Sequence, residues 1–80
     1  EAKGVVSQAC KNIKKTEYGK GKRNFQLIAG VSRYAQENAS ETMAEAFADV
    51  YANGKSANPL STEIVRLTEE KLKSYEGSEN

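Results

Sequence analysis

Apolar residues recur every three or four positions in three separate segments of this sequence, at residues 1–15, 39–53 and 61–75. This spacing gathers them on one side of an α-helix, which then needs a neighbouring element to cover that side. The chain has 80 residues, which is enough for one small hydrophobic core. We therefore predict a mainly α fold, a single small domain over residues 1–80 with three helices.

Residues 16–38 interrupt the helical pattern and are predicted to form a loop followed by an extended segment. Glycines and charged residues fill the first part, and from Phe25 to Val31 every second residue is apolar. This alternation is typical of a short strand, although Ile28 and Gly30 weaken it. Because one strand cannot form a sheet alone, a strand here would need a hairpin or a partner outside the chain. The choice between strand and irregular extended segment stays open.

The central segment carries signals for both ends of a helix. Asn38 is a favourable N-cap, Glu41 lies three residues further on as in a capping box, and Gly54 is a natural stop. The residues expected on the core side are Ala39, Met43, Ala46, Phe47, Val50 and Tyr51. The opposite side is expected to carry Glu41, Glu45, Ala48 and Ala52.

The last helix is marked by Pro59, by Ser61 as its expected cap and by Glu63 in its first turn. The inward stripe is expected to contain Ile64, Leu67, Leu72 and Tyr75. Two surface ion pairs are expected one turn apart, Arg66 with Glu70 and Glu69 with Lys73.

The chain contains no histidine and a single cysteine, Cys10. An internal disulfide, histidine-based acid–base catalysis and a self-sufficient zinc site of the usual ligand types are therefore excluded. No apolar run approaches the length that spans a bilayer, so no membrane association is expected. As an isolated chain, it is not expected to be an enzyme. Because the first residue is glutamate rather than methionine, we expect a segment of a larger protein.

Positive charge is concentrated in the N-terminal part of the chain. The formal net charge is only +1, yet most lysines and arginines precede residue 36. Such a cluster suits a nucleic-acid-binding surface, with Tyr18 and Phe25 available to stack on bases, or it simply solvates a helix and a loop. The residues of this alternative site are Lys11, Lys14, Lys15, Lys20, Lys22 and Arg23.

Two carboxylates, those of Glu41 and Glu45, are spaced one helical turn apart, so they must project from the same side of the central helix. The simpler interpretation is a solvated acidic face with Glu41 near the cap. The alternative is half of a metal site, in which one carboxylate binds zinc and the next orients a ligating imidazole. Ala48 and Ala52 continue this side, which suits a face pressed closely against another element.

The motif "Y-A-x-x-N-x-x-E-x-x-A-E-A-F-A", from Tyr34 to Ala48, resembles the third-ligand helix of lethal-factor-type zinc peptidases of the gluzincin class. Similar tails, over roughly residues 31–67, occur in phage minor head and head-morphogenesis proteins. The resemblance implies that Glu41 is a zinc ligand, that Glu45 supports it, and that Tyr34 stabilises an oxyanion if the parent protein is active. The H-E-x-x-H motif that supplies the other ligands and the base is absent.

Three functions follow as hypotheses. The first is a phage structural segment, a remnant or C-terminal part of a zinc-peptidase-like domain, which would lie in the virion or the bacterial host cytoplasm. Its partners would be the rest of the parent chain or other virion proteins. The second is part of an active zinc metallopeptidase, whose zinc would be held with an upstream H-E-x-x-H helix of the full-length parent. The third is the basic nucleic-acid-binding module.

Overall fold

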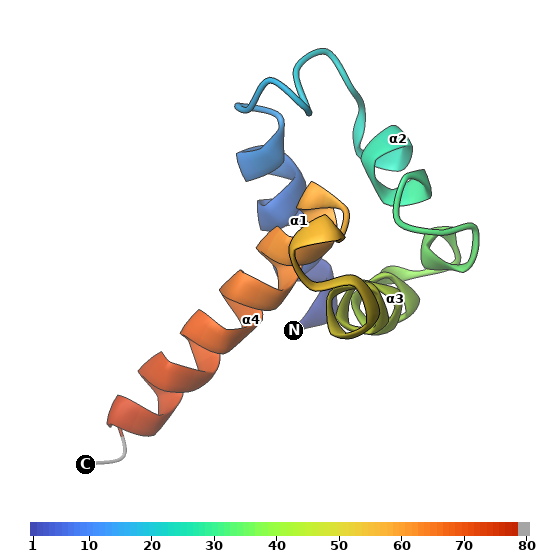
Figure 1. Ribbon diagram of the computed structural model, residues 1–80. Helices are drawn as coiled ribbons and strands as arrows, with labels where there is room; N and C mark the ends of the chain where they lie inside the picture. The colour runs from blue at the N-terminus through green and yellow to red at the C-terminus, as the bar shows by residue number, and fades with distance from the viewer. Residues whose placement is uncertain (79–80) are drawn as a thin grey trace.

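The computed structural model describes the backbone of residues 1–78 and the side chains of residues 1–74. Over that range the chain is helical and contains no strand, which confirms the predicted mainly α class (Figure 1). The elements in chain order are α1 (Ala2–Ile13), α2 (Asn24–Ala29), the 3₁₀ turn η1 (Tyr34–Gln36), α3 (Ala39–Asn53), the 3₁₀ turn η2 (Gly54–Ser56) and α4 (Pro59–Ser78).

The first half of α4 packs against both α1 and α3, whereas its C-terminal part projects from the body of the molecule (Figure 1). Two of its residues, Leu60 and Ile64, are fully buried between the other helices. Burial of a side chain of this size stabilises a fold by about 1.5–3 kcal/mol. Among the described side chains, the main cluster of buried core residues is Val5, Val6, Ala9, Cys10, Ile13, Leu27, Ala46, Leu60 and Ile64.

The prediction of an extended segment before the central helix is wrong, because Asn24–Ala29 forms α2. Of the alternating apolar residues only Leu27 is buried, and Phe25 is 62% exposed. Ile28 and Val31 pack partly against the core beside Leu27. Ile28 and Val31 follow Leu27 by one and four positions, which is the spacing of one side of a helix rather than of a strand. Ile28, which weakens the strand pattern, is therefore one of the residues that face the core.

The buried side of α3 also differs from the expectation. Thr42 and Ala46 are buried, whereas Phe47 is 40% exposed and Tyr51 is 95% exposed. The Thr42 hydroxyl has one proton to donate, and its oxygen lies 2.5 Å from the carbonyl oxygen of Ala35 and 3.0 Å from that of Asn38, so the two carbonyls share this donor. Because these bonds satisfy the hydroxyl, a polar residue occupies a core position that an apolar pattern does not predict.

Helix α4 begins at Pro59, and its cap is the preceding residue rather than Ser61. The Asn58 side-chain oxygen accepts a hydrogen bond from the N–H of Leu60 at 2.8 Å, while Ser61 is fully buried.

The rest of α4 matches the expectation only in part, since Leu72 is 58% exposed instead of facing inward. The expected place of Tyr75 in the stripe lies outside the described side chains. Of the two expected ion pairs, Arg66–Glu70 is present at 2.9 Å, and Glu69–Lys73 is not among the ion pairs of residues 1–74.

The connection between α1 and α2 turns closely over the end of α1. Gly19 is buried there, and its N–H donates to the Thr16 hydroxyl at 3.2 Å. A Cβ atom at this glycine would lie 2.1 Å from the carbonyl oxygen of Ile13. Only glycine therefore fits the position without a shift of the backbone.

We predict that Gly19→Ala lowers the free energy of unfolding by about 1–3 kcal/mol, because the added methyl group meets backbone atoms that cannot move independently. Gly4→Ala is the matched control, since its Cβ would meet only the Glu1 carboxylate at 3.6 Å. That change should stabilise α1 by about 0.5–1 kcal/mol. Urea unfolding followed by circular dichroism measures both, and equal midpoints for Gly19→Ala and the wild type would contradict the prediction.

Candidate functional site

The two candidate zinc-binding carboxylates lie on the first half of α3. The Asn38 side chain caps this helix by accepting a hydrogen bond from the N–H of Glu41 at 2.8 Å. The side chains of Glu41 and Glu45 are partly buried, and neither carboxylate makes a hydrogen bond or ion pair with another described residue. Their roles as ligand and supporting acid stay predictions.

Tyr34 lies on η1, which packs against α3. Its ring is 57% exposed, and the Arg33 guanidinium carbon lies 5.6 Å from the ring centroid. Tyr34 is therefore not a core residue whose ring is buried among apolar side chains. The predicted oxyanion role of Tyr34 needs a substrate and a metal that this chain alone does not supply.

The third acid of α3, Asp49, has its partners inside the chain. Its carboxylate accepts hydrogen bonds from the side chain of Asn53, at 2.7 Å, and from the backbone N–H of Asn58, at 2.9 Å. Desolvation opposes ionisation of this carboxyl group, but the Asn53 amide, the nearby Ser61 hydroxyl and the Asn58 N–H together lower its pKa. The Ser61 hydroxyl itself makes no hydrogen bond of good geometry. Asp49 thus joins the end of α3 to the beginning of α4.

Asn58 extends the same junction to two further parts of the chain. Its side-chain nitrogen donates hydrogen bonds to the Tyr18 hydroxyl at 3.0 Å and to the Gly30 carbonyl at 3.2 Å. Its side-chain oxygen meanwhile caps α4 through Leu60. One asparagine therefore connects the loop after α1, the end of α2, α3 and α4. The sequence signals its capping role, because Asn directly before Pro is typical of the start of a helix, but it does not signal the contacts with Tyr18, Gly30 and Asp49.

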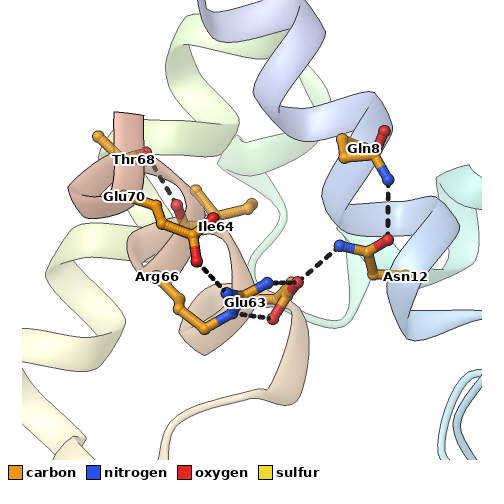
Figure 2. A network of polar contacts seen from close by, with 7 residues as sticks. All are labelled: Gln8, Asn12, Glu63, Ile64, Arg66, Thr68 and Glu70. Atoms are coloured by element: carbon orange, nitrogen blue, oxygen red, sulfur yellow. Dashed lines mark hydrogen bonds and ion pairs between the residues drawn. The ribbon is translucent and has the colours of Figure 1, made fainter. Parts of the chain in front are cut away.

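A second polar network joins α1 to α4 (Figure 2). Glu63 accepts a hydrogen bond from Asn12 at 2.7 Å. It also forms a bidentate ion pair with Arg66, with nitrogen–oxygen distances of 2.7 and 3.0 Å. Gln8 supports Asn12 by donating to it at 2.8 Å. The hydrogen bond from Arg66 lowers the pKa of Glu63; desolvation opposes this effect, and Asn12 contributes to it. This cluster fixes the packing of two helices and has no feature of a catalytic site.

The six basic residues of the alternative nucleic-acid surface are all exposed, at the end of α1 and in the loop that follows. None of them forms an ion pair with a described residue. Tyr18 is not free to stack, because the Lys22 ammonium lies 4.6 Å from its ring centroid and its hydroxyl binds Asn58. Phe25 remains available, with an exposed ring on α2. The surface thus combines unpaired cations with one free aromatic ring.

The side of α3 that points away from the core is apolar as well. We call it the outer face, and it consists of Ala44, Phe47, Ala48 and Tyr51, all exposed. Their spacing of three, four and seven residues forms a second helical stripe beside the core stripe. The sequence analysis missed this face because it assigned Phe47 and Tyr51 to the core. The signal that could have found it is that the apolar residues of α3 are too many for one side of a helix.

The donor set present does not form a complete metal site. The described residues bring together no group of three or more His, Cys, Asp or Glu side chains that could hold a metal ion. Since the chain has no histidine, Glu41 and Glu45 could contribute to a zinc site only with imidazoles from another segment. No chemical step through zinc is therefore derived for these residues.

Comparison of the chain with protein-family models, with curated proteins and with solved structures gave no match. None of the described helices is long and apolar enough to cross a membrane.

The lowered pKa values of Asp49 and Glu63 predict how stability changes with pH. Because both carboxyl groups have a lower pKa in the folded state than in the unfolded state, their contribution is complete above about pH 4–4.5 and is lost as the pH falls through the folded-state values. We expect urea midpoints to be constant from pH 7 to 5 and to decrease between pH 4 and 2. Asp49→Asn with Glu63→Gln should flatten this decrease. An unchanged pH profile in the double variant would contradict the assignment.

Proposed function

We propose that this chain is a non-catalytic helical docking module of a larger assembly, in keeping with its resemblance to tails of phage minor head proteins. The observation that carries the proposal is the outer face of α3. Tyr51, in the last two turns of the helix, is 95% exposed, and Phe47 one turn earlier is 40% exposed. Exposed aromatic rings gathered on one helical stripe are typical of surfaces that bind another protein.

The composition of this face favours docking over catalysis. Ala44 and Ala48 lie between the aromatic rings and are small enough to let a second backbone approach closely, while the rings supply most of the apolar area that a partner could bury. No Asp, Glu, Lys or Arg lies within the stripe. Glu41 and Glu45 lie beside it and would form its polar border. In the proposed assembly, the partners are the rest of a parent chain or other virion proteins, in the virion or the host cytoplasm.

The zinc-peptidase alternative uses the same region differently. Glu41 and Glu45 would then approach an H-E-x-x-H helix of the parent protein, with Tyr34 at the edge of the substrate site. The exposed position of Tyr34 and the unpaired carboxylates are compatible with this alternative. The zinc-peptidase alternative does not explain the outer face, because Phe47 and Tyr51 lie on a different side of α3 from the two carboxylates.

We predict that the protein, produced in cells together with the genes that flank its own, sediments with a high-mass assembly. Tyr51→Ser should lower the sedimenting fraction by about fivefold or more, because the ring supplies apolar area at the contact. Leu72→Ser, which removes an exposed apolar side chain from α4, is the matched control and should have no effect. Equal sedimentation of wild type and Tyr51→Ser would contradict the docking role.

The unpaired cations favour nucleic-acid binding as a second candidate function. If it is correct, the chain binds a fluorescently labelled DNA duplex at 20 mM salt, and the logarithm of the affinity falls steeply with the logarithm of the salt concentration. Substitution of Lys14, Lys15, Lys20 and Lys22 by glutamine should remove most of this dependence. Substitution of Lys71 and Lys73 on α4, two exposed lysines outside the cluster, is the control. A wild-type chain that does not bind at low salt would eliminate this candidate.

A further inference from the structure

We infer that the occupant of the outer face is a second copy of this chain, with its α3 antiparallel to the first. This inference rests on the proposed docking function and names its partner. Along the helix the four residues alternate in size, from small Ala44 to large Phe47, then small Ala48 and large Tyr51. A two-fold axis that passes between Phe47 and Ala48 pairs each large residue with a small one of the other copy.

The pairing follows from the sequence positions alone. In an antiparallel pair with this axis, Tyr51 of one copy packs on Ala44 of the other, and Phe47 packs on Ala48. Facing positions of opposite size allow two helices to interdigitate, as ridges of one enter grooves of the other. A parallel pair would place ring on ring and methyl on methyl, which leaves gaps beside the alanines. By size, the outer face is therefore complementary to itself in the antiparallel direction, and self-complementarity is what a two-fold interface requires.

Charge favours the same direction. Lys55 is the only cation between Arg33 and Arg66, and it lies in η2, directly after the C-terminal end of α3, where it is exposed. An antiparallel pair brings this end of one copy beside the N-terminal end of α3 in the other copy, where Glu41 lies in the first turn. Glu37 directly precedes Asn38, the cap of α3, and adds a second acid at that end. Two equivalent contacts between opposite charges would therefore form at the ends of the paired helices, whereas a parallel pair would bring Lys55 to Lys55.

The expected association is weak and reversible. One helical stripe of four side chains buries less area than the roughly 1,200–2,000 Å² of a stable interface. The dimer should therefore form only at high protein concentration, roughly in the micromolar to millimolar range. Such an affinity suits a module that many copies bring together in one assembly.

Sedimentation equilibrium of the 80-residue chain over a range from about 10 µM to 1 mM tests the inference. The wild type should shift from the monomer mass of 8.7 kDa towards twice that mass. Tyr51→Ser should raise the dissociation constant at least about tenfold, whereas Leu72→Ser, which removes an exposed apolar side chain from α4, should leave it unchanged. Glu41→Lys and Lys55→Glu should each weaken the dimer at low salt, and the double variant should restore it, because the two charges only exchange places.

A wild-type chain that remains monomeric at 1 mM would overturn the second copy as the occupant, and so would a dimer that Tyr51→Ser does not weaken. A double variant that is no tighter than the single variants would overturn the antiparallel direction. These outcomes are distinct from failure of the proposed function. If the chain is monomeric but Tyr51→Ser still lowers sedimentation with the larger assembly, the outer face binds a different protein.

Discussion

The arrangement of the whole chain depends on how α4 begins. Its first turns bury Leu60 and Ile64 between α1 and α3, and the hydrogen bonds of Asn58 hold this start against the other elements. The carboxylate of Asp49 completes the junction by accepting the backbone N–H of Asn58. Because the core is small, fixing the position of one helix end decides which side chains can be covered at all. Without this junction, α2 would be held mainly by Leu27 and its neighbours.

The three acids of α3 differ in what stabilises their negative charge. Asp49 has its partners within the chain, at the start of α4, and Glu41 lies in the first turn, where the helix dipole favours negative charge. Glu45 has neither kind of partner among the described residues. The absence of cations on this helix therefore does not by itself require a metal: for Asp49, backbone and amide donors take the place of positively charged side chains.

The proposed docking function would give α3 a second role beside packing. A helix that contributes only Thr42 and Ala46 as fully buried residues stabilises the core modestly, yet its opposite side carries Tyr51, the most exposed of the described aromatic residues, together with Phe47. Such a distribution adds no stability to the isolated domain. It becomes favourable when another protein covers the rings, which is why the docking role and the pairing of two copies account for it together.

The sequence by itself determined the helical class, the cap of α3 at Asn38 and its end at Gly54, because these features depend on local backbone chemistry and on spacing along one helix. It also determined the absence of a self-contained zinc site, through the missing histidines. Only the tertiary structure decided that residues 24–29 form a helix, that Thr42 rather than Phe47 faces the core, and that Asn58 joins α4 to three other parts of the chain. Each of these depends on which surfaces distant segments present to one another, and the spacing of residues within a segment carries no information about that.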